Sequence, residues 1–311
     1  MNRAVPLAVT AAVLSGVAVF VNSYGVKAVH DATVYTTGKN LVAGVTLLLI
    51  ALGSTRDRAA QITLPRKRGQ LIGLGVLAVV GGSVPFVLFF EGLSRIQSGP
   101  VQAQFINKTL VVWVSVLAVV FLRERVGVAQ VAAIGLLVAG QAVLAGGGSG
   151  LSKVSWGTGE LMILAATLFW AVEVVLAKVL LRSLSSWTVA LARMLAGSAL
   201  LVVWTAIRGK MSALAHLDAS QWKWIIVTGV LLAAYVATWL AALALAPAVT
   251  VTAVLVGAVP VTALLQAIVN GTPLGPQLSG LALLIAGAAI ALAAAPRVRG
   301  RLPTEQQVPV A

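Results

Sequence analysis

Long apolar stretches follow one another along this chain, and polar residues are gathered in the short segments between them. A helix needs roughly 20 mostly apolar residues to cross the hydrocarbon core of a bilayer. Ten stretches meet this requirement: 4–22, 34–53, 70–92, 99–121, 127–146, 158–181, 187–207, 224–246, 248–269 and 277–295. The pattern therefore predicts an all-α integral membrane protein with ten transmembrane helices.

Composition supports this prediction. Hydrophobic residues make up 59% of the 311 positions and charged residues only 10%, whereas roughly a quarter of a soluble domain is charged. The chain has no Cys, which excludes disulfides, thiolate nucleophiles and Cys-ligated zinc. The net charge of +14 comes from residues between the apolar runs, so it indicates membrane topology rather than binding of nucleic acid.

The distribution of Lys and Arg predicts the orientation, because cytoplasmic loops carry an excess of both. Thirteen of these residues fall on the side of the N-terminus and six on the other side. The sequence thus predicts a multi-pass protein of the cell membrane with both termini in the cytoplasm. The three remaining basic residues, Lys39, Lys108 and Arg193, fall within spans.

An internal repeat divides the chain into two halves of five spans. The end of each half is similar, "LLVAGQAV" at 136–143 and "LLIAGAAI" at 283–290, and the starts "VNSYGVK" and "VEVVLAK" pair Asn22 with Glu173. An odd number of spans inverts the second copy, an architecture typical of transporters. The predicted organisation is a first repeat (1–146), a Gly/Ser connector on the outer side (147–157), a second repeat (158–295) and a cytoplasmic tail (296–311).

The segment "FLRERVGVAQVAAIGLLVAG" (121–140) and its counterpart "AVPVTALLQAIVNGTPLGPQLSGLALLIAG" (258–287) resemble the EamA signature of the drug/metabolite transporter superfamily. The first copy departs from this signature at Val111, where the family favours Pro, and the second at Thr272-Pro273, near the expected Glu. The resemblance implies an alternating-access transporter whose spans 1, 3, 4, 6, 8 and 9 line a central cavity. It does not choose among amino acids, sugars, nucleotide-linked sugars and drugs as substrates.

Charged residues inside spans are costly and mark candidate functional positions. Glu173 and Arg193 each lie roughly 9 Å from the inner face, and Lys39 and Glu91 lie near the outer face, if each residue rises about 1.5 Å along a helix. We expect the ion pairs Glu173–Arg193 and Lys39–Glu91, acting either as structural clamps or as gates. Glu173 is also the candidate carrier of a coupling proton.

Lys108 lies roughly 14 Å deep in span 4, near the midplane, with no acid at a similar depth. Gln104, Asn107 and Ser115 share its face, which reads as a cavity lining. Asn22 in span 1 and Tyr235 and Trp239 in span 8 are candidates for the opposite walls. We expect Lys108 to bind the carboxylate of a small substrate such as an amino acid; a phosphorylated or nucleotide-linked sugar would need a larger cationic cluster.

Other functions fit the sequence less well. A membrane-embedded enzyme needs clustered acids, His or metal ligands, but the two His and eight acidic residues are scattered. We therefore predict no catalytic residues, no metal and no cofactor. A passive channel is the remaining alternative. The expected partners are a small-molecule substrate, the lipid bilayer and protons as the candidate coupling ion, and no oligomeric state is assigned.

Overall fold

The computed structural model describes residues 3–53, 62–95, 100–144 and 156–294, and all regular structure within these ranges is helical. The helices of the first half are α1 (Ala4–Val29), α2 (Ala32–Gly53), α4 (Arg68–Val80), α5 (Val84–Arg95), α6 (Pro100–Lys108), α7 (Leu110–Leu117), the π-helix η1 (Ala118–Leu122) and α8 (Val128–Leu144). Those of the second half are α10 (Thr158–Leu180), α11 (Ser186–Ile207), α12 (Met211–Ala215), α13 (Ala219–Leu245), α14 (Ala248–Leu255), α15 (Ala258–Asn270), the 3-10 helix η2 (Gly275–Gln277) and α16 (Leu278–Ala293). Most of the predicted connector and the tail lie outside the described residues.

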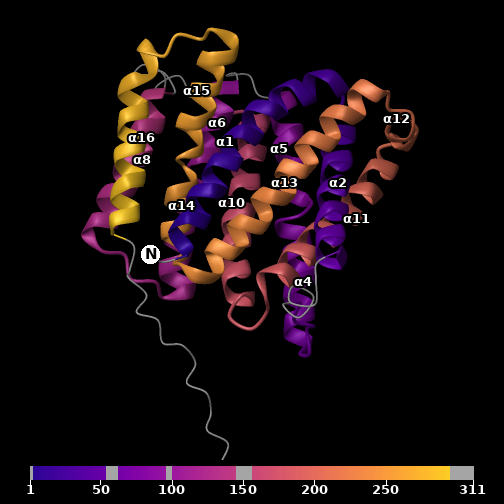
Figure 1. Cartoon of the computed structure of the whole chain (residues 1–311), viewed down its shortest axis with the longest axis horizontal. Coiled ribbons are helices and arrows are strands. Elements are labelled where there is room, and N and C mark those ends of the chain that lie inside the picture. Colours follow the sequence, from indigo (N-terminus) through magenta and orange to yellow (C-terminus); the bar gives the residue numbers. More distant parts are fainter. Residues whose placement is uncertain (1–2, 54–61, 96–99, 145–155, 295–311) are drawn as a thin grey trace, which may run out of the picture.

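Eight helical segments in the described residues are long and apolar enough to cross a membrane, and the shorter apolar helices α8 and α16 complete the predicted ten. These two helices are about 24–26 Å long at 1.5 Å per residue. They pack against each other at the left edge of the molecule in Figure 1. The predicted fold class is thus confirmed.

Contacts between the halves are related by an exchange of the two repeats. Helix α1 packs on α13 as α10 packs on α5, and α2 contacts α13 as α11 contacts α4. In the same way, α1 contacts α14 and α15, while α10 contacts α7 and α6. The pairs α2–α11 and α8–α16 join equivalent helices of the two halves. Each contact type therefore occurs twice or joins equivalent elements, as a two-fold relation between the repeats requires.

The α8–α16 contact explains the repeated small residues. A Cβ on Gly140 would lie 2.8 Å from the carbonyl oxygen of Gly280, and one on Gly287 would lie 2.9 Å from that of Ala133. Small residues let two helix backbones approach closely in a membrane, where packing rather than the hydrophobic effect drives association. The "AG" positions of both repeats thus serve this interface.

Three predicted spans are interrupted near their middle. Helices α4 and α5 are separated by residues 81–83, α6 and α7 by Thr109, and α14 and α15 by Val256 and Gly257. Thr109 donates its hydroxyl to the carbonyl of Ile106 at 2.6 Å. Discontinuous helices at mid-membrane depth are tolerated where they line a cavity, and transporters use them at substrate sites.

The short turn between α13 and α14 is held by two half-buried polar side chains. Lys178 Nζ donates to the carbonyl oxygens of Leu243 at 2.6 Å and Ala246 at 2.8 Å, at the end of α13. The carboxylate of Glu124 accepts from the backbone N–H groups of Ala248 at 2.8 Å and Val249 at 3.2 Å, at the start of α14. The free backbone groups of both helix ends are therefore satisfied.

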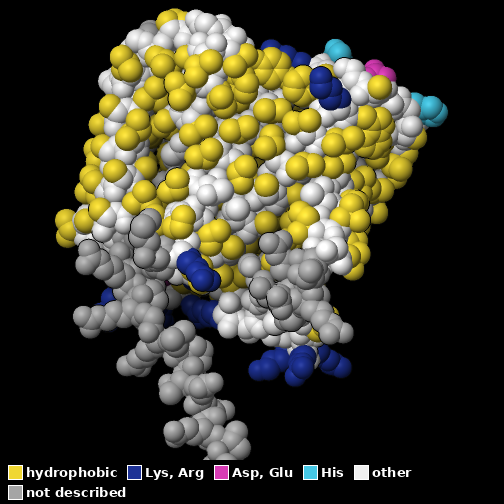
Figure 2. Space-filling view, viewed as in Figure 1, with side chains coloured by type: hydrophobic (Ala, Val, Ile, Leu, Met, Phe, Trp, Pro, Cys, Tyr) yellow, Lys and Arg dark blue, Asp and Glu magenta, His cyan; other side chains and the backbone are white. Residues whose placement is uncertain are grey.

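Hydrophobic side chains cover the middle of the visible face, and Lys and Arg lie toward its two ends (Figure 2). Exposed large apolar side chains on many helices, including Leu49, Phe121, Val203 and Ile268, would be unfavourable in water. A lipid-facing belt accounts for them. The protein is a multi-pass membrane protein.

Candidate substrate cavity

A cavity of about 290 Å³ lies between the two halves. It is lined by Ser15, Ala18, Val19, Asn22, Lys39, Phe86, Phe89, Phe90, Asn107, Lys108, Leu110, Val111, Trp170, Glu173, Val174, Arg193, Leu232, Tyr235, Trp239, Thr252, Leu255 and Val256. These residues come from both halves and from all three interrupted spans. Eight of the eleven sequence-predicted site residues are among them: Asn22, Lys39, Asn107, Lys108, Glu173, Arg193, Tyr235 and Trp239.

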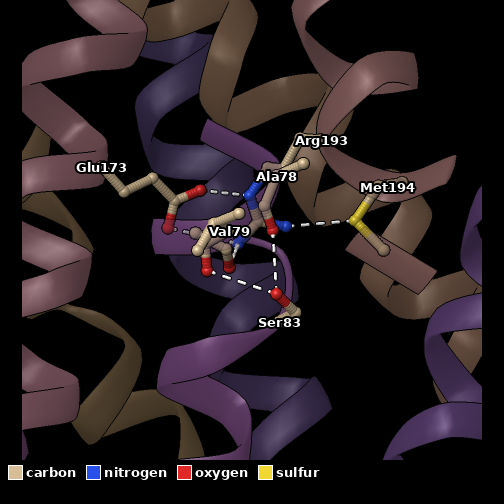
Figure 3. A network of polar contacts seen from close by, with 7 residues as sticks. Ala78, Val79, Ser83, Glu173, Arg193 and Met194 are labelled. Atoms are coloured by element: carbon tan, nitrogen blue, oxygen red, sulfur yellow. Dashed lines mark hydrogen bonds and ion pairs between the residues drawn. The ribbon is translucent and has the colours of Figure 1, made fainter. Parts of the chain in front are cut away.

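Glu173 and Arg193 form a buried ion pair in the wall of this cavity, as predicted from the sequence (Figure 3). Arg193 Nε donates to Glu173 Oε1, and Nη2 donates to Oε2 at 3.3 Å. Both side chains are no more than 5% exposed. Arg193 also donates to the carbonyl of Gly81 at 3.1 Å and contacts the sulfur of Met194 at 3.0 Å. The carboxylate is therefore fully engaged by its own arginine.

The break between α4 and α5 makes room for this pair. A Cβ on Gly81 would lie 2.2 Å from Glu173 Cδ, and one on Gly82 would lie 2.6 Å from the carbonyl oxygen of Arg193. Only glycine permits such a close approach. Ser83 donates its hydroxyl to the carbonyls at the end of α4, those of Ala78 at 3.2 Å and Val79 at 3.3 Å (Figure 3).

Lys39 does not pair with Glu91, so that expectation is wrong for this structure. Its ammonium lies 3.5 Å from Asn22 Oδ1 and over the rings of Tyr35, Phe86 and Phe90 at 5.2–5.9 Å. Cation–π contact stabilises a desolvated ammonium without supplying a counter-charge. Asn22, which the repeat pairs with Glu173, meets Lys39 in the first half as Glu173 meets Arg193 in the second.

Glu91 instead faces a second cavity, about 310 Å³ in volume, near the α1–α2 turn. Its carboxylate pairs with Arg95 at 3.1 Å and with Arg208, at the end of α11, at 3.2 Å. Arg208 lies closer to the surface than Lys39, so Glu91 keeps its charge paired without being buried. Phe86 and Phe90 line both cavities and therefore lie between them. Because the sequence predicts that Glu91 lies near the outer face, we call the second cavity the outer vestibule.

Lys108 is the last residue of α6, directly before the Thr109 break. The side chain is half-buried and lines the central cavity together with its neighbour Asn107. Among the residues that the structure describes, Lys108 has no hydrogen-bond or ion-pair partner. A lysine at a helix C-terminus is favoured by the helix dipole, but that interaction leaves its three donors free.

One predicted residue does not fit the cavity prediction, and the structure does not test a second. Ser115 lies one turn beyond Val111, is buried between helices and donates its hydroxyl to the Val111 carbonyl at 2.6 Å, so it does not line the cavity. Its own helix satisfies it because a serine hydroxyl reaches the carbonyl four residues earlier. Gln104 lies in α6, but its side chain is outside the described part of the chain.

A comparison with models of protein families identifies the family of this chain. The model of the EamA-like transporter family matches residues 2–146 and again residues 157–293, once in each half. The chain belongs to the EamA-like transporter family. This EamA protein is thus a membrane transporter of the drug/metabolite superfamily type, and its partners include a small-molecule substrate and the lipid bilayer.

Solved structures share the fold of this EamA protein. One, titled "Crystal structure of protein", matches with a TM-score of 0.73 and 18% sequence identity, over 93% of this chain and 98% of that chain. None of the curated proteins matches the sequence. The family and the fold therefore rest on independent comparisons, while the choice of substrate rests on the residues of the cavity.

Sequence reasoning missed most of the aromatic wall of the EamA cavity. Phe86, Phe89 and Trp170 meet edge-to-face or tilted, with ring centroids 5.5–5.6 Å apart, and Tyr235 stacks on Trp239 at 6.1 Å. The run "PFVLFFE" was a visible signal, because its three Phe are spaced i, i+3 and i+4 and therefore share one helical face. Thr252 was also missed; its position two residues after another Thr in an apolar span carried little signal.

Proposed function

We propose that this EamA protein is an alternating-access exporter of small anionic metabolites, and that the central cavity is its substrate site. The observation that carries the proposal is Lys108, a cation at a helix break in the cavity, with no partner in the described residues. A charge in a membrane needs a counter-charge or a hydrated cavity. A substrate carboxylate would supply that counter-charge each time it binds.

The walls suit a compact molecule with a polar end and an apolar body. Asn107 and Asn22 offer amide hydrogen bonds near the two lysines, and Tyr235 and Trp239 offer a flat apolar surface. An amino acid is the substrate that the sequence favoured. A carrier of phosphorylated sugars is the second candidate, and the presence of Lys39 in the same cavity favours it, because a phosphate needs more than one cation.

Alternating access requires the outer vestibule and the central cavity to be joined and separated in turn. We propose that Phe86 and Phe90 form the outer barrier, strengthened by the Glu91–Arg208 ion pair between α5 and α11. The equilibrium between the outward-open and inward-open states would then be biased by Glu173, Arg193 and Lys39. Glu173 stays a candidate for proton coupling, and an unchanged pH dependence of transport in Glu173→Gln would reject that role.

We infer the orientation from the charge bias: a protein of the cell membrane with both termini in the cytoplasm and the vestibule facing outward. The α1–α2 turn and α12 would then lie outside, and the turn between α10 and α11 inside. A reporter fused at Gly148 tests this arrangement, since that position should be external. A cytoplasmic reporter signal there would overturn the orientation.

Counterflow in proteoliposomes tests the transport proposal. Vesicles preloaded with an unlabelled anion should take up the same labelled anion transiently above its equilibrium level, and initial uptake should saturate. A channel would give neither saturation nor counterflow, and a membrane-embedded enzyme would give no flux. Lys108→Ala should abolish counterflow without changing the amount of folded protein in the vesicles.

A further inference from the structure

We propose that the central cavity selects a small organic dianion, either a dicarboxylate or a phosphate monoester, and rejects substrates that carry an ammonium group. This inference rests on the proposed function and narrows its substrate class. It follows from the balance of hydrogen-bond donors, acceptors and charges around the cavity.

The first step is the charge balance. Lys39, Lys108 and Arg193 line the cavity, and Glu173 is the one acid among the lining residues. Glu173 is engaged by Arg193 through both oxygens. Each lysine therefore faces the cavity without a carboxylate, since the rings and the Asn22 amide around Lys39 carry no charge. Two positive charges remain for a ligand to neutralise.

The second step is the set of donors without acceptors. The indole N–H of Trp239 and the hydroxyl of Thr252 are buried with no hydrogen-bond partner among the described residues, and both side chains line the cavity. An indole N–H can only donate. Buried polar groups are nearly always paired, and an unpaired one at a cavity marks a position that a ligand or water completes. The indole N–H therefore requires an oxygen acceptor, and the Thr252 hydroxyl can donate to one as well.

The third step is the lack of a free acidic group. The Glu173 carboxylate is engaged, and Asn22 Oδ1 already accepts from Tyr35 and Lys39. The other acceptors on polar lining side chains are neutral oxygens, the Asn107 amide and the hydroxyls of Ser15, Tyr235 and Thr252, and a neutral oxygen cannot balance a charge. An ammonium group would enter a cavity that holds two lysines and has no free carboxylate to pair with it. A zwitterionic amino acid is therefore disfavoured.

The size and the apolar walls limit the ligand further. A volume of about 290 Å³ admits a small metabolite and excludes a nucleotide-linked sugar, because it lies at the lower end of ligand pockets. Trp170 and Phe89 provide apolar surface for a short carbon chain. A dicarboxylate would place one group at each lysine, while a phosphate monoester would present several oxygens to one of them.

Binding measured by calorimetry on the purified full-length protein, with a matched ligand series, tests the inference. Glutarate represents the dicarboxylates and glycerol 3-phosphate the phosphate monoesters. Glutamate adds only an ammonium to glutarate, and 5-aminovalerate carries a protonated aminomethyl group in place of one carboxylate. We expect at least one of the two dianions to bind saturably. If glutarate binds, glutamate and 5-aminovalerate should bind at least tenfold more weakly than glutarate. If glycerol 3-phosphate alone binds, the site is a phosphate site, and phosphoethanolamine, which carries an ammonium in place of the diol, should bind at least tenfold more weakly.

Variants assign the binding to the cavity. Lys39→Met and Lys108→Met should each weaken binding of the dianion at least tenfold, and Lys223→Met, an exposed lysine on α13, should leave it unchanged. Trp239→Phe removes the indole N–H together with part of the ring and should also weaken binding, which provides a test should a lysine variant fail to fold. Without ligand, Lys108→Met should unfold at the same temperature as the parent protein or higher, because it loses no partner.

The inference is overturned if neither dianion binds, if glutamate or phosphoethanolamine binds as tightly as its parent dianion, or if both lysine variants keep full affinity. Its failure is distinguishable from failure of the transport proposal. Dianion binding without counterflow would reject transport and leave the ligand class standing, whereas counterflow of a zwitterion without dianion binding would reject the ligand class and leave transport standing.

Discussion

Replacing Glu173 with Gln should strongly destabilise the protein, because Arg193 would stay buried without its counter-charge. Both side chains are almost fully buried, and the carboxylate accepts two hydrogen bonds from the guanidinium. Removing one partner of a buried ion pair typically costs about 3–5 kcal/mol. Gln keeps one acceptor oxygen, and a hydrogen bond contributes about 1 kcal/mol. Arg193 also keeps its bond to the Gly81 carbonyl, so we expect a loss of about 3 kcal/mol.

Unfolding of purified protein in detergent, followed by tryptophan fluorescence, measures this loss. Glu91→Gln is the matched control, because its carboxylate also binds arginine but lies in the outer vestibule, and exposed pairs contribute at most about 1 kcal/mol. The double variant Glu173→Gln/Arg193→Met should regain much of the stability, since it buries no unpaired charge. Equal losses in Glu173→Gln and Glu91→Gln, or no recovery in the double variant, would refute the reasoning.

Two further changes test other features of the structure. Gly81→Ala should lower stability by roughly 1–3 kcal/mol through overpacking, because its Cβ would lie 2.2 Å from Glu173 Cδ. Gly75→Ala is the control: its Cβ would meet no atom within 4 Å, so it should be neutral or stabilising in the same unfolding assay. An equal loss of stability in both variants would contradict close packing at Gly81. Burial alone would raise the pKa of Asp31, but the hydrogen bond from Lys210 and the N–H groups of Val34 and Thr33 hold that pKa below its usual range. The ionised Asp31 therefore stabilises the folded protein above the pKa of an unfolded aspartate, about 3.9. This stabilisation is lost as the pH falls through the lower pKa that Asp31 has in the folded protein. Parent protein should therefore lose stability relative to Asp31→Asn between about pH 5 and pH 3; parallel stability curves would contradict the assignment.

The sequence predicted the fold well because spans, repeats and small-residue motifs are local patterns. Apolar runs located all ten helices, and the similar ends of the two halves located the repeat that the family model matches twice. The break at residues 81–83 has a local signal in Pro85, which lacks a backbone N–H. The close approach of Glu173 and Arg193 to this break was not predicted, because no local pattern records it. The helix that ends at Lys108 shows the same limit, since the break follows from one threonine hydroxyl.

The candidate site could be predicted in part. Depth and helical face were enough to place Lys108 and Asn107 at the cavity and to predict the Glu173–Arg193 ion pair. Depth and helical face did not predict the partner of Glu91. The sequence suggested Lys39, but Glu91 pairs with Arg208, which is distant in the sequence at the end of α11. Depth also failed for Ser115, because a helical face continues past the point where a cavity ends.

Accessibility of the central cavity from both sides of the membrane tests the central claim most directly. The chain has no native Cys, so Ser15→Cys places a single thiol at the cavity, with Ser183→Cys and Ser212→Cys as controls for the inner and outer faces. An impermeant maleimide applied to right-side-out or inside-out vesicles should label each control from one side only. The account predicts that Ser15→Cys is labelled from both sides and protected by a bound dianion. Labelling of Ser15→Cys from a single side under all conditions would contradict it.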